Sequence, residues 1–254
     1  MKRTFIYVLA VILCFCALAC KKTPPKLDSK QCTKAKGYYQ LGVSYMNADD
    51  STSALEEFLK AEEMCPADPD LQNAMGLIYY SKEKFDKAIT HLKKAIELDP
   101  ENSDAKHNLG VLYLYLNQYD SAITLFQEAL ENDLYRNQAN TLNALGWAYF
   151  KKKNYLKAEA FFNQTLDRDR LYLPAYVNLG KVYIALERYQ DSTAILEKAL
   201  QLNPYYAEAH LDMGISYMKL GNNEKAVFHF KKALEYEPLG KIGSQAQEFL
   251  NLLE

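Results

Sequence analysis

The sequence has few of the residues that catalysis or metal binding requires. It has four histidines, and none is spaced from another as a metal ligand: His91, His107, His210 and His229. It has neither a glycine-rich loop that could cradle phosphate nor the serine turn of a hydrolase. We therefore expect no enzyme, no cofactor, no metal site and no small-molecule substrate.

An excess of charge of one sign is lacking too. The 254 residues include 30 basic and 32 acidic side chains, which gives a formal net charge of −2. Removal of Lys2 and Arg3 with a leader would leave 28 basic against 32 acidic residues, a net charge of −4. Neither balance is typical of nucleic-acid binding, so we expect no nucleic acid partner. With 49% hydrophobic residues, the chain is long enough for one large domain.

The chain begins with an apolar run that is short for a membrane span. Lys2 and Arg3 precede a continuous apolar run over 5–19, and Cys20 follows. A run of 15 residues is too short to cross a bilayer comfortably. The pattern therefore predicts an export signal peptide at 1–19.

The residues before Cys20 resemble the lipobox of bacterial lipoproteins. Ala17-Leu18-Ala19 matches its small residues, although the lipobox usually has leucine in the place of Ala17. The resemblance implies that Cys20 is acylated and becomes the first mature residue, anchored to the membrane by its lipid. Alternatively, Ala17 and Ala19 form an ordinary signal-peptidase site, and the protein is secreted without lipid.

Residues 20–34 would then form a lipidated tether. Lys21 and Lys22 stand where an aspartate would imply inner-membrane retention, so the sorting rule of that family implies the periplasmic face of the outer membrane. Pro24-Pro25 and several lysines predict an extended segment. The fourteen residues 21–34 would reach at most roughly 45 Å, at about 3.3 Å per residue.

Glycine is infrequent, yet six of the ten glycines recur in one pattern. Each follows a leucine or methionine and precedes a tyrosine by three residues, at intervals of 34, 34, 36, 34 and 34: Gly42, Gly76, Gly110, Gly146, Gly180 and Gly214. Twelve residues after each glycine stands an alanine or serine, and four further on a phenylalanine or leucine. This period and pattern are similar to those of the tetratricopeptide repeat, a helical hairpin that stacks on its neighbours.

We expect each glycine to allow a close approach between the two helices of its hairpin. Glycine within a helix costs about 1 kcal/mol relative to alanine, so six glycines in one register must be offset by a gain in packing. The small residues of the second helix would meet this gap, with tyrosine and phenylalanine side chains beside it.

The sequence therefore predicts an all-α protein, a right-handed superhelical solenoid of six tetratricopeptide hairpins with a C-terminal capping helix. The repeats would occupy 35–68, 69–102, 103–136, 139–172, 173–206 and 207–240, with the capping helix at 241–254. Asn117 and Gly221-Asn222-Asn223 are typical stops between the helices of a hairpin. The two extra residues fall near 134–138, where we expect a local distortion.

Cysteine is scarce, with five residues in all. Cys14 and Cys16 would leave with the leader and Cys20 would carry lipid, which leaves Cys32 and Cys65. These two flank the first hairpin, and antiparallel helices place such ends side by side. In an exported protein we expect a disulfide between them, contributing roughly 3 to 4 kcal/mol. The alternative is two unpaired thiols.

In tetratricopeptide solenoids the first helix of each hairpin lines the concave face, partly through repeat positions 9 and 12. Position 9 is apolar here in every repeat except the one with Lys181, and position 12 is apolar throughout. Exposed apolar strips usually mark partner sites. We therefore predict a partner-binding groove centred on Trp147, the one tryptophan, and formed by Val43, Met46, Leu77, Tyr80, Val111, Leu114, Trp147, Phe150, Ile184, Ile215 and Met218. Alternatively, superhelical coiling or the last helix covers the strip.

The clamp with which some tetratricopeptide proteins hold acidic peptides is absent. Asn108 and Asn178 stand at position 6, but Leu77 and Trp147 precede them at position 9, where that clamp has a polar residue. An apolar groove suits an amphipathic helix or an extended apolar peptide.

The combination of Cys20, six repeats and the segment from Leu134-Tyr135 to Leu145-Gly146-Trp147-Ala148-Tyr149 resembles the type IV pilus pilotins, the PilF, PilW and Tgl group. The resemblance implies an outer-membrane lipoprotein that binds the pilus secretin subunit and promotes its localisation and assembly into a multimer. Cys20 as acyl acceptor and the groove around Trp147 are the site residues that it supports. Two alternatives remain: a scaffold lipoprotein that recruits other envelope proteins such as cell-wall enzymes, and a soluble periplasmic adaptor.

Overall fold

The computed structural model describes residues 29 to 253, and within that range every regular element is a helix. The predicted signal peptide, Cys20 and the first part of the tether lie outside the described residues. The hairpins in chain order are α2 (Ser29–Asn47) with α3 (Ser51–Met64), α4 (Pro69–Ser81) with α5 (Phe85–Leu98), α6 (Ser103–Tyr115) with α7 (Tyr119–Leu130), α8 (Gln138–Lys151) with α9 (Tyr155–Arg168), α10 (Leu173–Ala185) with α11 (Tyr189–Leu202), and α12 (Ala207–Lys219) with α13 (Asn223–Tyr236), before a last helix α14 (Lys241–Leu253). None of the helices in residues 29–253 has the length and apolar character needed to cross a bilayer.

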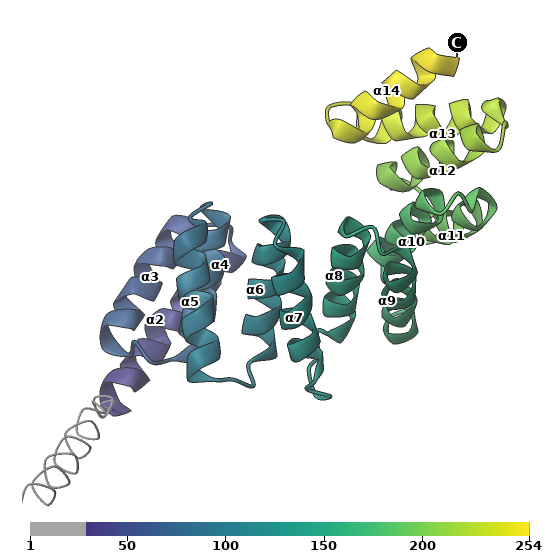
Figure 1. Cartoon of the computed structure of the whole chain (residues 1–254). Coiled ribbons are helices and arrows are strands. Elements are labelled where there is room, and N and C mark those ends of the chain that lie inside the picture. The colour runs from purple at the N-terminus through teal and green to yellow at the C-terminus, as the bar shows by residue number, and fades with distance from the viewer. Residues whose placement is uncertain (1–28, 254) are drawn as a thin grey trace, which may run out of the picture.

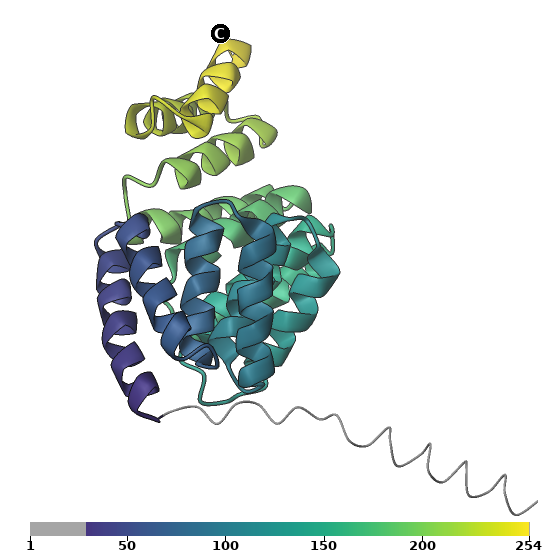
Figure 2. The same ribbon diagram turned by 90° about the vertical axis from the view of Figure 1, so that its left-hand side faces the viewer.

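The six hairpins stack side by side, and their helix axes turn along the chain. In Figure 1, α3 to α9 stand upright, whereas α12 to α14 lie across the view. Figure 2 shows the same turn from the side. Each second helix contacts the first helix of the next hairpin, and successive first helices also contact one another. The first helices therefore form one continuous layer of the predicted superhelical solenoid, which is confirmed.

The recurring glycines are the points of closest contact between the helices of each hairpin. A Cβ atom on Gly146 would lie 2.7 Å from the ring of Phe162, closer than real Cβ contacts permit. The other five glycines face a phenylalanine or leucine at the equivalent position: Phe58, Leu92, Phe126, Leu196 and Phe230. Small residues of the second helix do meet the glycine backbone, as where the Ser192 hydroxyl donates to the Gly180 carbonyl at 3.2 Å, but the expectation that the large side chain lies beside the gap is wrong. The large side chain four positions later fills it, while the alanine of this pair, Ala158, is buried beside it.

The turn inside each hairpin follows one rule of backbone geometry. The residue at repeat position 15 has a positive φ in all six repeats: Asp49, Glu83, Asn117, Lys153, Glu187 and Gly221. In the second repeat the amide of Lys84 donates to the carbonyl of Tyr79 at 2.8 Å, the closing bond of a Schellman turn. Five of the six residues are not glycine, so the residue type at position 15 does not reveal most of these helix ends.

The N-terminal end of the solenoid is tied by a disulfide. Cys32 and Cys65, 33 residues apart, are joined with their Cα atoms 4.9 Å apart. The bridge holds the start of α2 against the end of α3. Residues 29–34, assigned from the sequence to the extended tether, are helical, because this anchorage supports a longer first helix than the repeat alone requires.

The C-terminal end is covered by α14, which packs on α13 and α12. Ala246 and Leu250 are buried there, and the ring of Phe249 stacks on Phe230 at 4.9 Å between centroids. The helix thus closes the core of the sixth hairpin.

The two extra residues between repeats three and four lie in the loop 131–137. α7 has 12 residues where the equivalent helix α9 has 14, so part of the length difference is taken from the helix end. Phe126, Leu145 and Phe162 belong to one continuous cluster of buried side chains across this junction. The core therefore continues through it.

Candidate protein-binding surface

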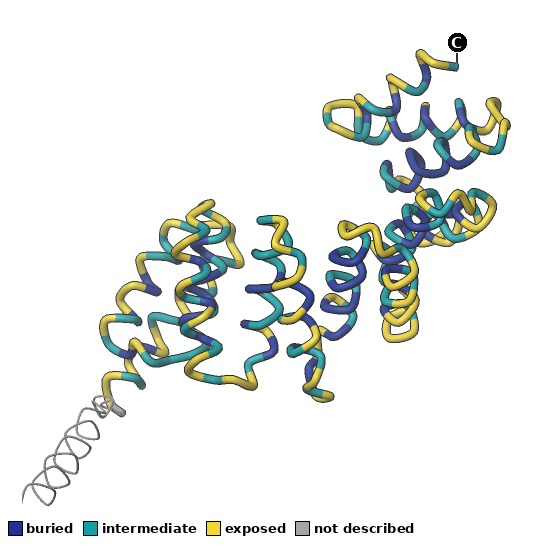
Figure 3. Tube along the Cα trace, in the orientation of Figure 1, coloured by how far each residue is buried: buried dark blue, intermediate teal, exposed yellow. Residues whose placement is uncertain are grey.

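The eleven residues predicted to form a groove all lie on first helices, and all are partly exposed. We call them the apolar strip. They come in sequence from α2, α4, α6, α8, α10 and α12, which follow one another in a single layer. Figure 3 shows that most residues of the first helix α8 are buried or partly buried, whereas exposed residues recur along the second helix α9. Within residues 29–253, α14 contacts α12 and α13, so it leaves the strip uncovered on α2 to α10, whereas Ile215 and Met218 on α12 pack against the cluster that α14 completes.

The middle of the strip is aromatic. The rings of Trp147 and Phe150 stack with centroids 5.0 Å apart, and Tyr155 packs against Phe150 at 5.5 Å. The ammonium group of Lys151 lies 4.8 Å from the Trp147 ring, a cation–π contact at the edge of the strip. The result is an aromatic patch with a positive charge at its border.

A second aromatic cluster lies two repeats earlier and was not found from the sequence. Tyr80 belongs to the predicted strip, but Phe85 on α5 and Tyr115 on α6 do not. Their ring centroids lie 5.2 Å apart, and each is about 6 Å from Tyr80. Tyr115 is 56% exposed, so the cluster widens the apolar surface toward solvent. Tyr115 stands at position 13 of its repeat, and it faces Tyr80 and Phe85 at positions 12 and 17 of the preceding repeat. This contact between repeats was not predicted from the sequence.

The strip is interrupted between α10 and α12 by an ionic cluster. The Lys181 ammonium lies 2.6 Å from Asp212 and 3.3 Å from Glu208. Burial opposes the charge on Lys181, but Asp212 and Glu208 together raise its pKa above the ordinary value. Burial also raises the pKa of Asp212 to about 6, despite the adjacent ammonium. These three charged side chains, which we call the ionic step, thus separate the apolar surface of the first four repeats from Ile215 and Met218.

Asparagine pairs border the strip at two places. The Asn108 amide donates to Asn73 at 2.9 Å, and the Asn178 amide donates to Asn143 at 3.0 Å. Each pair joins successive first helices. The position-6 asparagines are therefore engaged within the solenoid, at the positions where a peptide clamp would use them.

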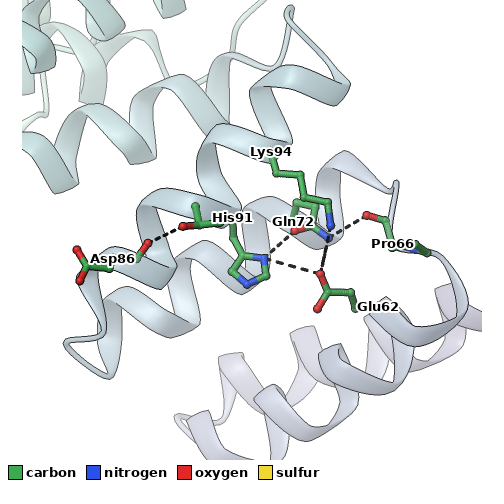
Figure 4. Close-up of polar contacts among 7 residues, drawn as sticks. Glu62, Pro66, Gln72, Asp86, His91 and Lys94 are labelled. Atoms are coloured by element: carbon green, nitrogen blue, oxygen red, sulfur yellow. Dashed lines mark hydrogen bonds and ion pairs between the residues drawn. The ribbon is translucent and has the colours of Figure 1, made fainter. Parts of the chain in front are cut away.

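The histidines pack between helices. His91 donates from Nδ1 to the Gln72 amide oxygen, 2.7 Å away, and the fully buried Gln72 donates to Glu62 and to the Pro66 carbonyl, each at 3.0 Å (Figure 4). His107 similarly bonds Thr141. Within residues 29–253, no group of three or more His, Cys, Asp or Glu side chains is arranged to hold a metal ion.

Four family models described as TPR or tetratricopeptide repeats match residues 35–68, 76–116, 103–170 and 183–241. They follow the hairpins over most of the described chain. The chain is a tetratricopeptide repeat protein. Proteins with this fold typically bind other proteins and act as scaffolds. No curated protein sequence matches the chain.

Solved tetratricopeptide repeat structures superpose on the chain over most of its length. PilW, a widely conserved type IV pilus biogenesis factor, is 20% identical, with a TM-score of 0.78 over 84% of this chain and 98% of PilW. PilF of Pseudomonas aeruginosa is 18% identical, with a TM-score of 0.77 over 88% of this chain and 100% of PilF. YrrB, a protein with an unusual peptide-binding site, is 20% identical, with a TM-score of 0.58 over 75% of this chain and 97% of YrrB. At these identities the similarity shows a shared fold.

Proposed function

We propose that the protein is an outer-membrane pilotin, a lipoprotein that holds an apolar segment of the type IV pilus secretin and promotes its localisation and assembly. Two findings support this proposal. The fold matches PilW and PilF over nearly their whole length. The first-helix layer also carries an apolar strip with two aromatic clusters.

The strip is the observation on which the proposal rests. Trp147, Phe150 and Tyr80 are partly exposed, and burial of their remaining apolar surface against a client is favourable because water is released from it. The ionic step at Lys181 marks one end of the uninterrupted apolar surface. We therefore place the client along α2, α4, α6 and α8.

The lipid on Cys20 would hold the solenoid at the inner leaflet of the outer membrane. A client bound to an anchored protein is concentrated at the surface where it must assemble, without any new contact. Shielding of its apolar segment before assembly would also limit aggregation. A Cys20→Ser variant should lose acyl labelling and leave the outer-membrane fraction, and persistence of both would contradict the anchor.

Client binding by the apolar strip, which we call the grip, is tested by substituting glutamate for two residues of the strip. Trp147→Glu combined with Val111→Glu should abolish secretin multimers and secretin crosslinking in envelopes, with helix content unchanged in circular dichroism. Phe228→Glu is the matched control, because Phe228 is 55% exposed on the second helix α13 and lies outside the strip. Unchanged multimers in the double variant would refute the grip. Capture of cell-wall enzymes in place of secretin would favour the scaffold alternative.

A further inference from the structure

A pocket of about 460 Å³ lies on the side of α8 that faces away from the strip. Leu145 lines this pocket and Trp147 lies in the strip. Residues two apart on a helix point about 200° apart. The pocket is bounded by α7 and α9, so it opens between two second helices, and it is separate from the surface assigned to the client.

The floor of the pocket is apolar. It is formed by Leu130, Leu142, Leu145 and Phe161, of which Leu142 and Leu145 are buried. Phe161 is held flat by stacking on Tyr149, with ring centroids 5.4 Å apart. A ligand that enters must therefore present an apolar or aliphatic portion to this floor.

Gln138 supplies an unpartnered acceptor at the pocket. Its side chain is buried, with the residue 6% exposed, and its amide nitrogen donates to the carbonyls of Asn132 and Asp133, each at 3.2 Å. Both partners are acceptors, so the amide NH₂ must face them and the side-chain oxygen Oε1 points elsewhere. Among residues 29–253, no hydrogen bond reaches that oxygen, while Gln138 lines the pocket.

The mouth of the pocket is acidic. Glu131, Asp133 and Asp167 contribute three carboxylates, and Arg168 contributes one cation, which leaves an excess of negative charge. Carboxylates are hydrogen-bond acceptors without donors. The pocket therefore combines an apolar floor with an excess of acceptors.

We propose that this pocket binds an arginine side chain of a partner protein. Its three-carbon stem would lie on the leucine floor, and its guanidinium would donate to Gln138 and to the carboxylates of Glu131 and Asp133. Arginine suits such a site because its planar fork has five donors, no acceptor and a weakly hydrated charge. The pocket would give the solenoid a second partner site, opposite to the one that holds the client.

The furrow one repeat earlier provides an internal control. It lies between α5, α6 and α7, has about 420 Å³, and also has an apolar floor that includes Ile96 and Leu109. Its charged lining is Lys93 and Glu97, which balance each other. Asp99 stands 34 residues before Asp133 but does not line this furrow, and no counterpart of Gln138 lines it either. Shape alone would predict binding to both furrows, whereas the proposed chemistry predicts binding to one.

The experiment uses the peptide Ac-Leu-Arg-Leu-NH₂ and its citrulline counterpart, which keeps the shape but has no charge. Both are titrated into the protein while amide shifts are followed by NMR. The arginine peptide should shift signals of α7, the 131–137 loop, the start of α8 and α9. The citrulline peptide should bind about tenfold more weakly or worse, since a hydrogen bond between charged groups is stronger than one with a neutral donor.

Variants separate this site from nonspecific attraction. Glu131→Gln with Asp133→Asn should weaken the arginine peptide about tenfold, whereas Glu97→Gln in the earlier furrow and Trp147→Glu in the strip should leave its affinity unchanged. Arg168→Gln should strengthen binding. Equal binding of the two peptides, or shifts spread over both furrows, would overturn the proposal, and neither result would bear on the client surface.

Discussion

At the residue scale, the six repeat glycines are explained by one contact. Each is faced by a phenylalanine or leucine ring or branch at a distance that no Cβ could share. The cost of glycine in a helix, about 1 kcal/mol, is offset by the packing of that large side chain against bare backbone. Where no large side chain packs on a helical glycine, that glycine should only lower the stability of the protein.

Two glycine substitutions test this reasoning with opposite signs. Gly146→Ala forces its Cβ against Phe162 and should destabilise the protein by about 1 to 3 kcal/mol. Gly37→Ala, in α2, meets nothing within 4 Å and should stabilise it by about 0.5 to 1 kcal/mol. Urea unfolding midpoints measure both. A shift in the same direction for the two variants would contradict the packing explanation.

The sequence predicted that a close approach occurs at these glycines but placed the large side chain beside the contact and not on the glycine. Spacing shows that the positions of Gly146, Ala158 and Phe162 recur together in every repeat. It does not show which side chain points at the glycine, because that depends on the crossing angle of two helices. Only the coordinates separate Phe162, which lies on the glycine, from Ala158, which lies beside it.

At the scale of elements, α12 and α13 are joined by a histidine pair in which His210 is buried and His229 is partly buried. The Nδ1 atoms of His210 and His229 lie 2.9 Å apart, and Nε2 of His210 lies 3.0 Å from the Pro204 carbonyl. That carbonyl can only accept, so His210 donates through Nε2, accepts at Nδ1, and receives the proton of His229. Burial and then the neighbouring His210 lower the pKa of His229 to about 4.

This pair predicts a loss of stability in mild acid. In the unfolded chain His229 takes up a proton near its ordinary pKa of 6.5, whereas in the folded chain it does so near 4. Between these values the unfolded state binds more protons, so stability falls as the pH drops from about 6.5 to about 4. The pH dependence of the unfolding free energy should be shallower in His229→Gln. Parallel curves for the two proteins would show that the pair contributes nothing.

Two features of the elements could not be predicted from composition. The first turns of α2 are polar, with Ser29 and Lys30, and nothing in that composition distinguishes a tether from a helix that a disulfide supports. The left-handed residues at the hairpin turns include Glu83 and Lys153, which ordinarily avoid that conformation. Glu83 and Lys153 adopt this conformation because the two flanking helices fix the course of the backbone between them.

At the scale of the whole molecule, stability is the sum of contacts between neighbouring repeats. The ends differ: the first hairpin is closed by Cys32 and Cys65, and the last is covered by α14. Loss of either end should therefore act on the nearest hairpin first.

Truncation after Leu239 tests this expectation. It removes the cover from Phe230 and its surroundings, at about 1.5 to 3 kcal/mol for each large side chain exposed. Hydrogen exchange should then speed up in α12 and α13 while amides of α4 to α7 keep their protection. A uniform loss of protection along the chain would show that the solenoid unfolds as one unit.

The period of 34 residues was enough to predict the stack of hairpins. The residues of the apolar strip were chosen from the known layout of tetratricopeptide repeats; they lie partly exposed on first helices, and their role in binding stays a prediction. Three features arise from contacts between repeats, which a period does not describe. These are the aromatic cluster at Tyr115, the ionic step at Lys181 and the pocket beside Gln138. The pocket depends on the two-residue insertion between repeats three and four, where the 34-residue period is broken.

The disulfide of the first hairpin also determines how a pulling force enters the molecule. If the chain is held at its N-terminus, tension arrives at Ser29 and reaches Cys32 within one turn of α2. From there the covalent bridge carries the load directly to the end of α3. The hairpin between the two cysteines is bypassed, so it cannot be peeled open from the anchored end. An anchored solenoid would thus resist drag on its client at its first repeat.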